Sequence, residues 1–216
     1  MDRRRFLASA GATAVAGPVF ADVPSVPPNN HLAFRVLRNN SPIGEHHLNF
    51  TRNGDDFRVD INAALLVTLA GIPIFRYVAS ATELWSGGVF QSLDSKVNDN
   101  GNHLEVHARK TALGYDVVGT HVPHYTCPPN TLPLTYWNKA MLNGTILNIQ
   151  TAHSYPAVVH SPGWNRLPTA NDGFIVAQRF DVTGKLRLSV WYDQMDQWSS
   201  LAFQIDGNEC YEKIVT

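Results

Sequence analysis

Two adjacent histidines, His46 and His47, lie in a segment with the alternating pattern of a β-strand, IGEHHLNF. Side chains alternate between the two faces of a strand, so the two rings point in opposite directions and cannot form one site. His46 shares its face with the apolar Leu48 and Phe50, which predicts that it is buried. His47 shares the polar face and is expected to be solvated. A buried imidazole needs partners for its ring nitrogens.

Other polar side chains lie on otherwise apolar strand faces and are candidate partners. In IPIFRYVASATELW, Tyr77 and Glu83 share the apolar face, and in VFQSLDSKV the hydroxyl of Ser95 lies among aliphatic residues. His46, Glu83 and Ser95 directed inward would suit the base, orienter and nucleophile of a hydrolase or isomerase. They would equally suit a hydrogen-bond network in the wall of a pocket. The sequence contains no G-x-S-x-G elbow and nothing that indicates an oxyanion hole.

Residues 63–75, AALLVTLAGIPIF, are apolar on both strand faces. One interpretation is a strand buried between the sheet and a helix. The other is a strand that faces the core on one side and an apolar ligand cavity on the other. The second interpretation makes a small apolar molecule or a lipid the expected partner.

A third group of titratable residues alternates on one face of NHLEVHAR, namely His103, Glu105 and His107. This spacing could offer three ligands to zinc or copper, but any half-buried strand has the same pattern on its wet side. We find no haem C-x-x-C-H, no dinucleotide fingerprint and no copper Cys–His–Met cluster. No metal and no cofactor is therefore predicted.

The N-terminus predicts export. Arg3, Arg4 and Arg5 precede Phe6-Leu7 and a short Ala/Gly-rich stretch that ends in Val19-Phe20-Ala21, so residues 1–21 fit a signal peptide of the twin-arginine type. An ordinary secretory signal is the alternative. The expected location is the periplasm or the medium, and the expected partners during export are the twin-arginine machinery and signal peptidase.

Cleavage after Ala21 removes three arginines and one aspartate, which changes 17 basic and 18 acidic residues into 14 and 17, a net charge of −3 with histidine neutral. This balance argues against nucleic acid or an anionic membrane surface as a partner. Two cysteines remain, Cys127 and Cys210. In an oxidising compartment they could form a disulfide, and the alternative is two buried free thiols.

The mature chain predicts one all-β domain over residues 31–216, preceded by an extended Pro-rich leader at 22–30. Short segments with a period of two alternate with Gly-, Asn- and Pro-containing turns, which is typical of an antiparallel meander. We expect a barrel or a strongly curved half-barrel. One stretch differs, because Thr135 could be the N-cap of a short helix near 135–142 that ends at Asn143-Gly144.

The chain resembles an uncharacterised family of exported bacterial proteins recorded as a domain of unknown function. Four segments over about residues 32–214 carry the resemblance: the I-G-x-H motif Ile43-Gly44-Glu45-His46, TELWSGGVFQSLDSKVNDNG (82–101), the T-Y-W-N-type motif Leu132-Pro133-Leu134-Thr135-Tyr136-Trp137-Asn138, and LRLSVWYD. The resemblance implies a β-rich single domain and supplies no activity. It adds Trp137 and Asn138 to His46 and Ser95 as candidate site residues.

Three functions remain open at this point. The first is a periplasmic protein that binds a small apolar or amphipathic ligand in a β-barrel cavity through His46, Tyr77, Glu83, Ser95, Trp137 and Asn138. The second is a periplasmic hydrolase or isomerase that uses His46 with Glu83 or Ser95. The third is a structural or assembly factor that acts through its surface.

Overall fold

The computed structural model describes residues 25–204 and 208–215, most of which belong to sixteen strands and one short 3-10 helix. The first half of the main sheet contains β1 (His31–Arg38), β2 (Ser41–Asn53), β3 (Asp56–Leu69), β4 (Ile72–Ser86), β5 (Val89–Asp99), β6 (Asn102–Lys110), β7 (Tyr115–Gly119) and β8 (Val122–Cys127). Its second half contains β12 (Val159–Pro168), β13 (Phe174–Val182), β14 (Leu188–Tyr192), β15 (Trp198–Gln204) and β16 (Asn208–Lys213). Between the halves lie β9 (Thr131–Pro133), η1 (Lys139–Asn143), β10 (Thr145–Leu147) and β11 (Ser154–Pro156).

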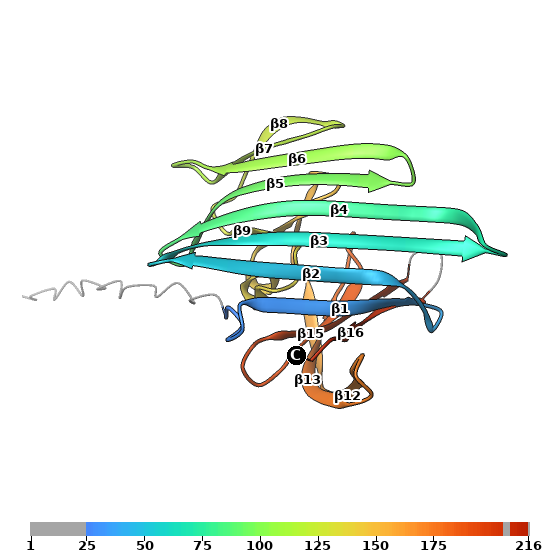
Figure 1. Cartoon of the computed structure of the whole chain (residues 1–216). Coiled ribbons are helices and arrows are strands. Elements are labelled where there is room, and N and C mark those ends of the chain that lie inside the picture. The colour runs from blue at the N-terminus through green and yellow to red at the C-terminus, as the bar shows by residue number, and fades with distance from the viewer. Residues whose placement is uncertain (1–24, 205–207, 216) are drawn as a thin grey trace, which may run out of the picture.

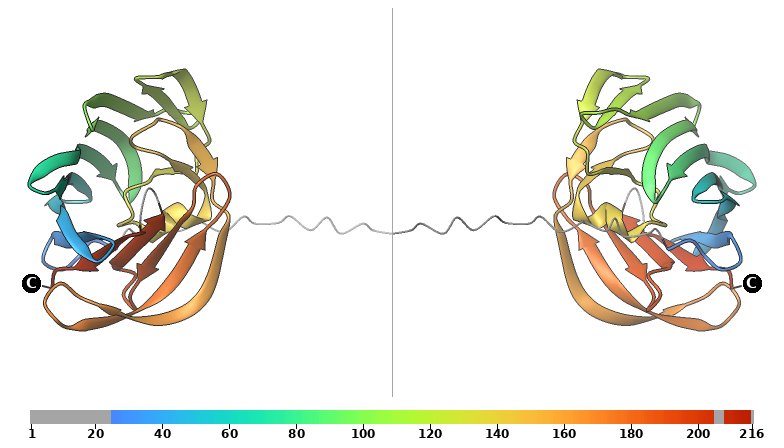
Figure 2. Two further views of the ribbon diagram at one scale, coloured as in Figure 1. Left: turned by 90° about the vertical axis from the view of Figure 1, so that its right-hand side faces the viewer. Right: turned by 90° about the vertical axis from the view of Figure 1, so that its left-hand side faces the viewer.

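The main sheet is a long antiparallel meander that runs in the order β12-β13-β14-β15-β16-β1-β2-β3-β4-β5-β6-β7-β8. The last strand, β16, pairs with the first, β1, and so joins the two halves. The sheet curls strongly but remains open, with β8 and β12 as its edges (Figures 1 and 2). The prediction of an all-β antiparallel meander is confirmed, and of its two forms the structure has the open half-barrel.

Alternation of apolar and polar residues determines which face of each strand lies inside the curl. Phe34, Leu48, Val59, Leu93 and Val106, from five strands, are all fully buried at 0% exposure. Their neighbours along the strands point to the convex face, which faces solvent. The prediction for the two histidines holds, since His46 is buried and His47 is half-exposed on the opposite face.

The segment between β8 and β12 folds back onto the concave side of the sheet (Figure 2). Here β10 pairs in parallel with β9 and antiparallel with β11. The predicted short helix is present as η1, but it begins later than expected. Its N-cap is Asn138, whose side-chain oxygen accepts from the amide of Ala140, and not Thr135. Tyr136 has a φ of 68°, and this left-handed conformation prevents a helix from starting before it.

Gly44, in the I-G-x-H motif, occupies a position that no other residue can fill. Its φ is 151°, and a Cβ atom there would lie 1.9 Å from the carbonyl oxygen of Ala64 on β3. Strands β2 and β3 therefore approach one another closely beside His46. In this motif the glycine allows the close approach of the two strands, and the histidine provides the inward-facing polar side chain.

The predicted disulfide is not formed, since Cys127 and Cys210 are both free thiols. Cys127, at the end of β8, is 1% exposed and belongs to the core inside the curl. Cys210 lies on β16 between Glu209 and Tyr211, which both face inward, so its own side chain points to the convex face. Two thiols on opposite faces of the sheet cannot join, and this prediction was wrong.

The predicted signal peptide, residues 1–21, lies outside the described part of the chain. Of the predicted leader, residues 25–30 are described: Ser25 lies against the turn that follows β14, and the carbonyl of Asn30 accepts from the amide of Phe50 on β2. Ser25 donates from its hydroxyl to the carbonyl of Met195, and the side chain of Gln197 donates to the carbonyl of Ser25. Among the described residues there is no helix with the length and apolar character needed to cross a membrane.

Candidate functional site

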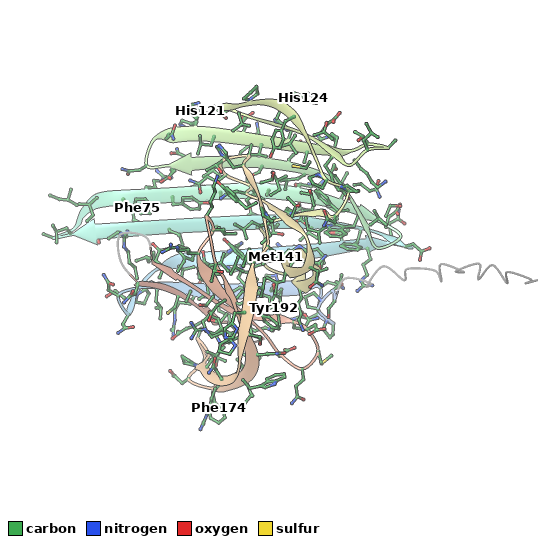
Figure 3. All side chains as sticks on the ribbon, turned by 180° about the vertical axis from the view of Figure 1, so that it is seen from behind. Phe75, His121, His124, Met141, Phe174 and Tyr192 are labelled. Atoms are coloured by element: carbon green, nitrogen blue, oxygen red, sulfur yellow. The ribbon has the colours of Figure 1, made fainter. Side chains whose placement is uncertain are left out.

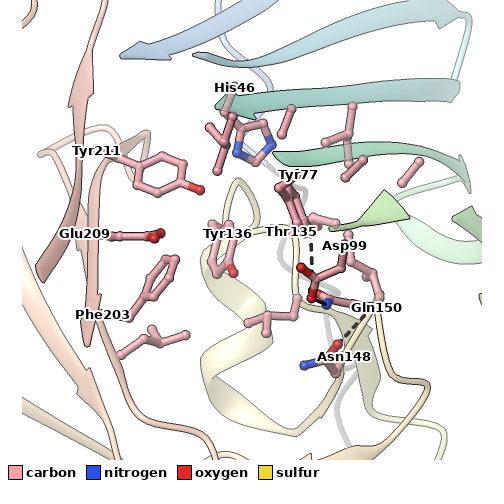
Figure 4. A pocket seen from close by; sticks show the side chains of 18 of the residues that line it. His46, Tyr77, Asp99, Thr135, Tyr136, Asn148, Gln150, Phe203, Glu209 and Tyr211 are labelled. Atoms are coloured by element: carbon pink, nitrogen blue, oxygen red, sulfur yellow. Dashed lines mark hydrogen bonds between the residues drawn. The ribbon is translucent and has the colours of Figure 1, made fainter. Parts of the chain in front are cut away.

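The concave side holds a cavity of about 340 Å³ between the main sheet and the inner segment (Figure 4). One wall is apolar and comes from the inward faces of β3 and β4. Ala63 and Ala79 lie level with His46 across these strands, and Ile61 and Ala81 lie one inward position farther along. Small alanine side chains at these positions leave room that larger aliphatic residues would fill.

The opposite wall is aromatic and polar. Phe203 comes from β15, Glu209 and Tyr211 come from β16, and Tyr136 comes from the inner segment. Figure 4 shows that the Tyr211 hydroxyl and the Glu209 carboxylate point into the cavity, with the Tyr136 ring between them and Tyr77. The cavity is thus amphipathic, with aliphatic side chains on one side and hydroxyl and carboxyl groups on the other.

His46 lies at the top of the cavity in this view and is 6% exposed. Its ring meets the rings of Trp198 and Tyr211 edge-on, at centroid distances of 5.4 and 5.7 Å. Neither ring nitrogen has a hydrogen-bond partner among the described residues. Burial lowers the pKa of His46 to about 3, and the neighbouring His47 contributes in the same direction. His46 is therefore a neutral imidazole with one donor and one acceptor available.

The phenol groups around the cavity remain protonated at neutral pH. Burial raises the pKa of Tyr77 to about 12, and the nearby carboxylates of Asp99 and Glu209 add to this shift. Burial also raises the pKa of Tyr136 and of Tyr211, again with a contribution from Glu209. These hydroxyls can each donate one hydrogen bond and accept others.

Glu209 is the carboxylate of the aromatic wall and is 8% exposed. Burial raises its pKa, while the positive charge of Arg38, directly across on β1, acts in the opposite direction. The far end of the cavity has a second carboxylate, Asp99, whose Oδ2 accepts from Nε2 of Gln150 at 2.9 Å. The Tyr77 hydroxyl in turn donates to Oε1 of Gln150 at 3.5 Å.

Tyr77 is the second predicted site residue, after His46, that lines the cavity, whereas Glu83 does not. Ala79 is level with His46, and Glu83 lies four residues farther along β4, which corresponds to roughly 13 Å of strand. Glu83 Oε2 accepts from the indole nitrogens of Trp85 and Trp137 at 2.8 and 3.1 Å. Burial raises the pKa of Glu83 to about 7, and hydrogen bonds from Thr135 and the two indoles oppose this shift.

Ser95 is 1% exposed and faces the core, as predicted, but it is also outside the cavity. Its hydroxyl and both nitrogens of His46 lack hydrogen-bond partners among the described residues, so the two side chains are not bonded to each other or to Glu83. The nucleophile, base and orienter arrangement of the hydrolase hypothesis is thus not formed. The three inward-facing polar residues lie in three separate environments.

The four side chains of the T-Y-W-N motif have three roles: core packing, helix capping and lining the cavity. Trp137 is 1% exposed and packs edge-on against Phe50, Phe57 and Trp85 at centroid distances of 5.2, 5.8 and 5.3 Å. Asn138 caps η1, and Thr135 lies beside Glu83 and also lines the cavity. Neither Trp137 nor Asn138 reaches the cavity. The left-handed backbone at Tyr136 turns this ring into the cavity, so of the two adjacent aromatic residues it is Tyr136, and not the predicted Trp137, that lines the cavity.

The alternating face His103, Glu105 and His107 forms no metal site in the described structure. His107 Nδ1 lies 2.6 Å from Oδ1 of Asp94, and Glu105 lies 3.3 Å from the Lys96 ammonium. No group of three or more metal-binding side chains occurs within residues 25–204 and 208–215. Glu105 and His107 thus contact charged side chains of the neighbouring strand on the convex face.

The sequence interpretation missed the aromatic wall, namely Tyr136, Phe203, Glu209 and Tyr211, together with Gln150. Alternation along NECYEK places Glu209 and Tyr211 on one face, but it does not say which face is inside. Which face lies inside depends on the pairing of β16 with β1, two strands from opposite ends of the described chain. Glu209 was the available signal, as an acidic residue in phase with an aromatic one.

Comparisons with known proteins agree with this fold. Residues 34–213 match the family described as Domain of unknown function (DUF6134). Comparison with curated proteins gives no match. A crystal structure of a beta-barrel-like protein of the domain of unknown function DUF1849, from Brucella abortus, superposes with a TM-score of 0.56 at 7% identity, over 85% of this chain and 94% of that one. This likeness concerns the fold alone. Because the family match spans nearly all of the described residues, the chain belongs to the DUF6134 family.

Proposed function

We propose that this protein binds a small amphipathic molecule in the cavity beside His46. The observation that carries the proposal is a buried imidazole in a cavity wall with both ring nitrogens unpartnered. A buried polar group without a hydrogen bond is costly, and a ligand that donates to or accepts from His46 would remove that cost. The beta-barrel-like fold is compatible with this role.

The cavity also indicates the character of the ligand. About 340 Å³ is at the lower end of the range for small-molecule pockets. The alanine-lined wall of β3 and β4 suits an aliphatic or ring-shaped apolar part. The hydroxyls of Tyr77, Tyr136 and Tyr211 suit a neutral polar group near His46, since none of these four groups carries a charge at neutral pH.

The test is native mass spectrometry of protein purified from its own cell envelope, followed by binding of the apolar fluorophore N-phenyl-1-naphthylamine to the emptied cavity. We expect the purified protein to retain an organic molecule, and we expect the emptied protein to bind the fluorophore at the place that this molecule occupied. His46→Phe should reduce retention of the molecule and binding of the fluorophore. Ser95→Ala is the matched control, because Ser95 is also buried and unpartnered but lies outside the cavity.

Equal retention by the His46→Phe protein and the wild type would contradict the role of His46. The absence of both a retained mass and fluorophore binding in the wild type would overturn the proposed function itself.

We further propose that the protein acts in the periplasm or after secretion, based on the sequence of residues 1–21. Cell fractionation tests this. The wild type should appear in the periplasm or the medium in its cleaved form, and the double change Arg3→Lys and Arg4→Lys should retain the precursor in the cytoplasm if the signal is of the twin-arginine type.

A further inference from the structure

The hairpin between β3 and β4 extends beyond the rest of the sheet (Figure 1). The pairing of β3 with β2 ends at Leu65, and the pairing of β4 with β5 ends at Tyr77. Residues 66–76 are here called the hairpin tip, and they pair with one another and, within the described residues, with no further strand. At its base the carbonyl of Arg76 accepts from the amide of Asn100 at 2.8 Å. A two-stranded ribbon without neighbouring strands has both edges uncovered. Figure 3 shows Phe75 on this projecting ribbon.

The hairpin tip is apolar where a solvated ribbon would be polar. Leu66, Leu69, Ile72 and Ile74 are 46%, 67%, 67% and 54% exposed, and no residue from 62 to 75 carries a charge. The sequence interpretation of 63–75 is thus half right. One face of this segment lines the cavity, but the other face is neither core nor cavity and is open to solvent.

The turn itself differs from the comparable turns of the same sheet. Three other hairpins have two-residue turns with both residues at positive φ, namely Asn39-Asn40, Gly87-Gly88 and Asn100-Gly101. Asparagine and glycine are the residues that tolerate this conformation. In the hairpin tip the first position is Ala70, with a φ of 50°. Ala70 thus occupies a left-handed position for which asparagine or glycine would be more favourable.

Basic side chains lie behind the apolar tip. Arg76 is exposed on β4, directly after the uncharged run. The guanidinium of Arg38, at the end of β1, lies 5.7 Å from the centre of the Phe75 ring. Three carboxylates lie near this end: Asp99 accepts from Gln150, Glu45 lies 2.7 Å from His47 Nε2, and Glu209 faces the cavity, where the charge of Arg38 acts on it. Apolar side chains in front of arginines match the order of acyl chains and phosphates in a phospholipid layer.

We propose that the hairpin tip inserts into the surface of a phospholipid bilayer. Leu69 and Ile72 enter the acyl region, while Arg76 and Arg38 lie at the level of the phosphates. Insertion is shallow, because the uncovered backbone edges of the ribbon need water or headgroups as partners. Leu65 and Phe75, at the base of the hairpin tip, line the cavity, so docking brings the cavity close to the bilayer. The inference concerns a surface and holds whether or not the cavity retains a ligand.

Flotation of the mature protein with phosphatidylcholine vesicles tests the proposal. The wild type should float with the vesicles, also at high salt, because apolar insertion and not net charge drives binding. The double change Leu69→Ser and Ile72→Ser should lose most of the bound fraction. Its melting temperature should stay close to that of the wild type, since the tip lies outside the core. Arg76→Gln should bind with a smaller loss.

The matched control is Leu113→Ser. Leu113 is 82% exposed in the turn after β6, at the opposite end of the sheet, and this change should leave flotation unaffected. Three results would overturn the proposal: a wild type that stays in the soluble fraction, a tip variant that floats as well as the wild type, and binding that requires anionic lipid and disappears at high salt. A wild-type dimer in solution that the tip change dissociates would assign the surface to a second copy of the chain instead.

Discussion

Two buried clusters on the concave side of one sheet use the same kinds of residues with different results. In the first, called here the packed cluster, Glu83 lies among Phe57, Trp85 and Trp137, and one carboxylate oxygen accepts from both indoles. In the second, the cavity cluster, His46 lies among aromatic rings with both nitrogens unpartnered. In the packed cluster one carboxylate oxygen of Glu83 is bonded within the protein and the other, Oε1, is not, whereas in the cavity cluster neither nitrogen of His46 is bonded.

The difference shows how a binding site can be recognised without a known ligand. Burial alone does not distinguish the clusters, since Glu83 and His46 are 0% and 6% exposed. What distinguishes them is the cavity, which lies beside His46 and not beside Glu83, and the two indole donors, which Glu83 has and His46 lacks. Satisfied buried networks stabilise and specify a fold, whereas unpaired polar groups at a cavity are retained at a cost in stability, which is typical of function.

The largest expected effect compares two adjacent aromatic residues. Trp137→Ala should lower the free energy of unfolding by roughly 3–5 kcal/mol, because it removes a fully buried ring and one donor to Glu83. Tyr136→Ala removes a ring that faces the cavity and should cost roughly 1 kcal/mol. Urea denaturation of both variants measures the difference. Equal losses would show that Tyr136 belongs to the packed cluster and would break the distinction.

The second prediction uses the opposite pKa shifts of the two clusters. Burial raises the pKa of Glu83 from 4.5 to about 7, so the folded protein holds a proton that the unfolded chain releases, and stability falls as pH rises from 4.5 through 7. Burial lowers the pKa of His46 from 6.5 to about 3, so the unfolded chain takes up a proton first, and stability falls as pH falls from 6.5 towards 3. Between 4.5 and 6.5 the two effects oppose each other.

Single variants should separate these effects. The stability of Glu83→Gln relative to the wild type should increase as pH rises from 4.5 through 7, and that of His46→Phe should increase as pH falls below 6.5. Each slope should approach about 1.4 kcal/mol per pH unit at its steepest. Denaturant titrations across this range provide the measurement. Parallel slopes for the two variants would contradict the assigned protonation states.

The sequence predicted those features that depend on local alternation. The inward position of His46, Tyr77, Glu83 and Ser95 follows from the two-residue period of single strands, and the structure has all four on the inner face. A β-bulge marks the limit of this reasoning. Strict alternation places Gln91 on the face of Ser95, but the register shifts between Leu84 and Trp85, and Phe90 turns inward instead.

Features that depend on how distant strands meet were not predictable in this way. The grouping of inward residues into two clusters depends on the distance along the strands between His46 and Glu83, and on the inner segment that covers Glu83 with Trp137. The aromatic wall depends on the pairing of β16 with β1. Neither leaves a periodic trace in the sequence. The apolar residues of 63–75 were recognised, but solvent exposure of their outer face depends on where the neighbouring strands end.

A smaller effect is expected at His46 itself. In ligand-free protein, His46→Phe should raise the free energy of unfolding by about 1 kcal/mol, because it replaces two unpartnered polar atoms with apolar ones of similar shape. Ligand retention should decline in the same variant. Thermal denaturation and native mass spectrometry of one sample measure both quantities. A loss of roughly 1–3 kcal/mol would mean that His46 has a partner within the protein and belongs with the packed type of cluster.

The smallest expected effect is an unchanged melting temperature on reduction. It tests whether a disulfide links the two clusters. Cys127 neighbours Tyr115 on β7, close to the packed cluster, while Cys210 lies on the cavity strand β16. A disulfide between them would close a loop of 84 residues, 127 through 210, and would contribute up to roughly 4.5 kcal/mol in the chain-entropy model. Because the thiols are free and point to opposite faces of the sheet, adding a reductant should leave the melting temperature unchanged. Thiol titration of the unfolded, unreduced protein should find two free thiols. A melting temperature that falls on reduction would show that the two clusters are covalently joined, and that the curl brings β8 and β16 together in a way this structure does not contain.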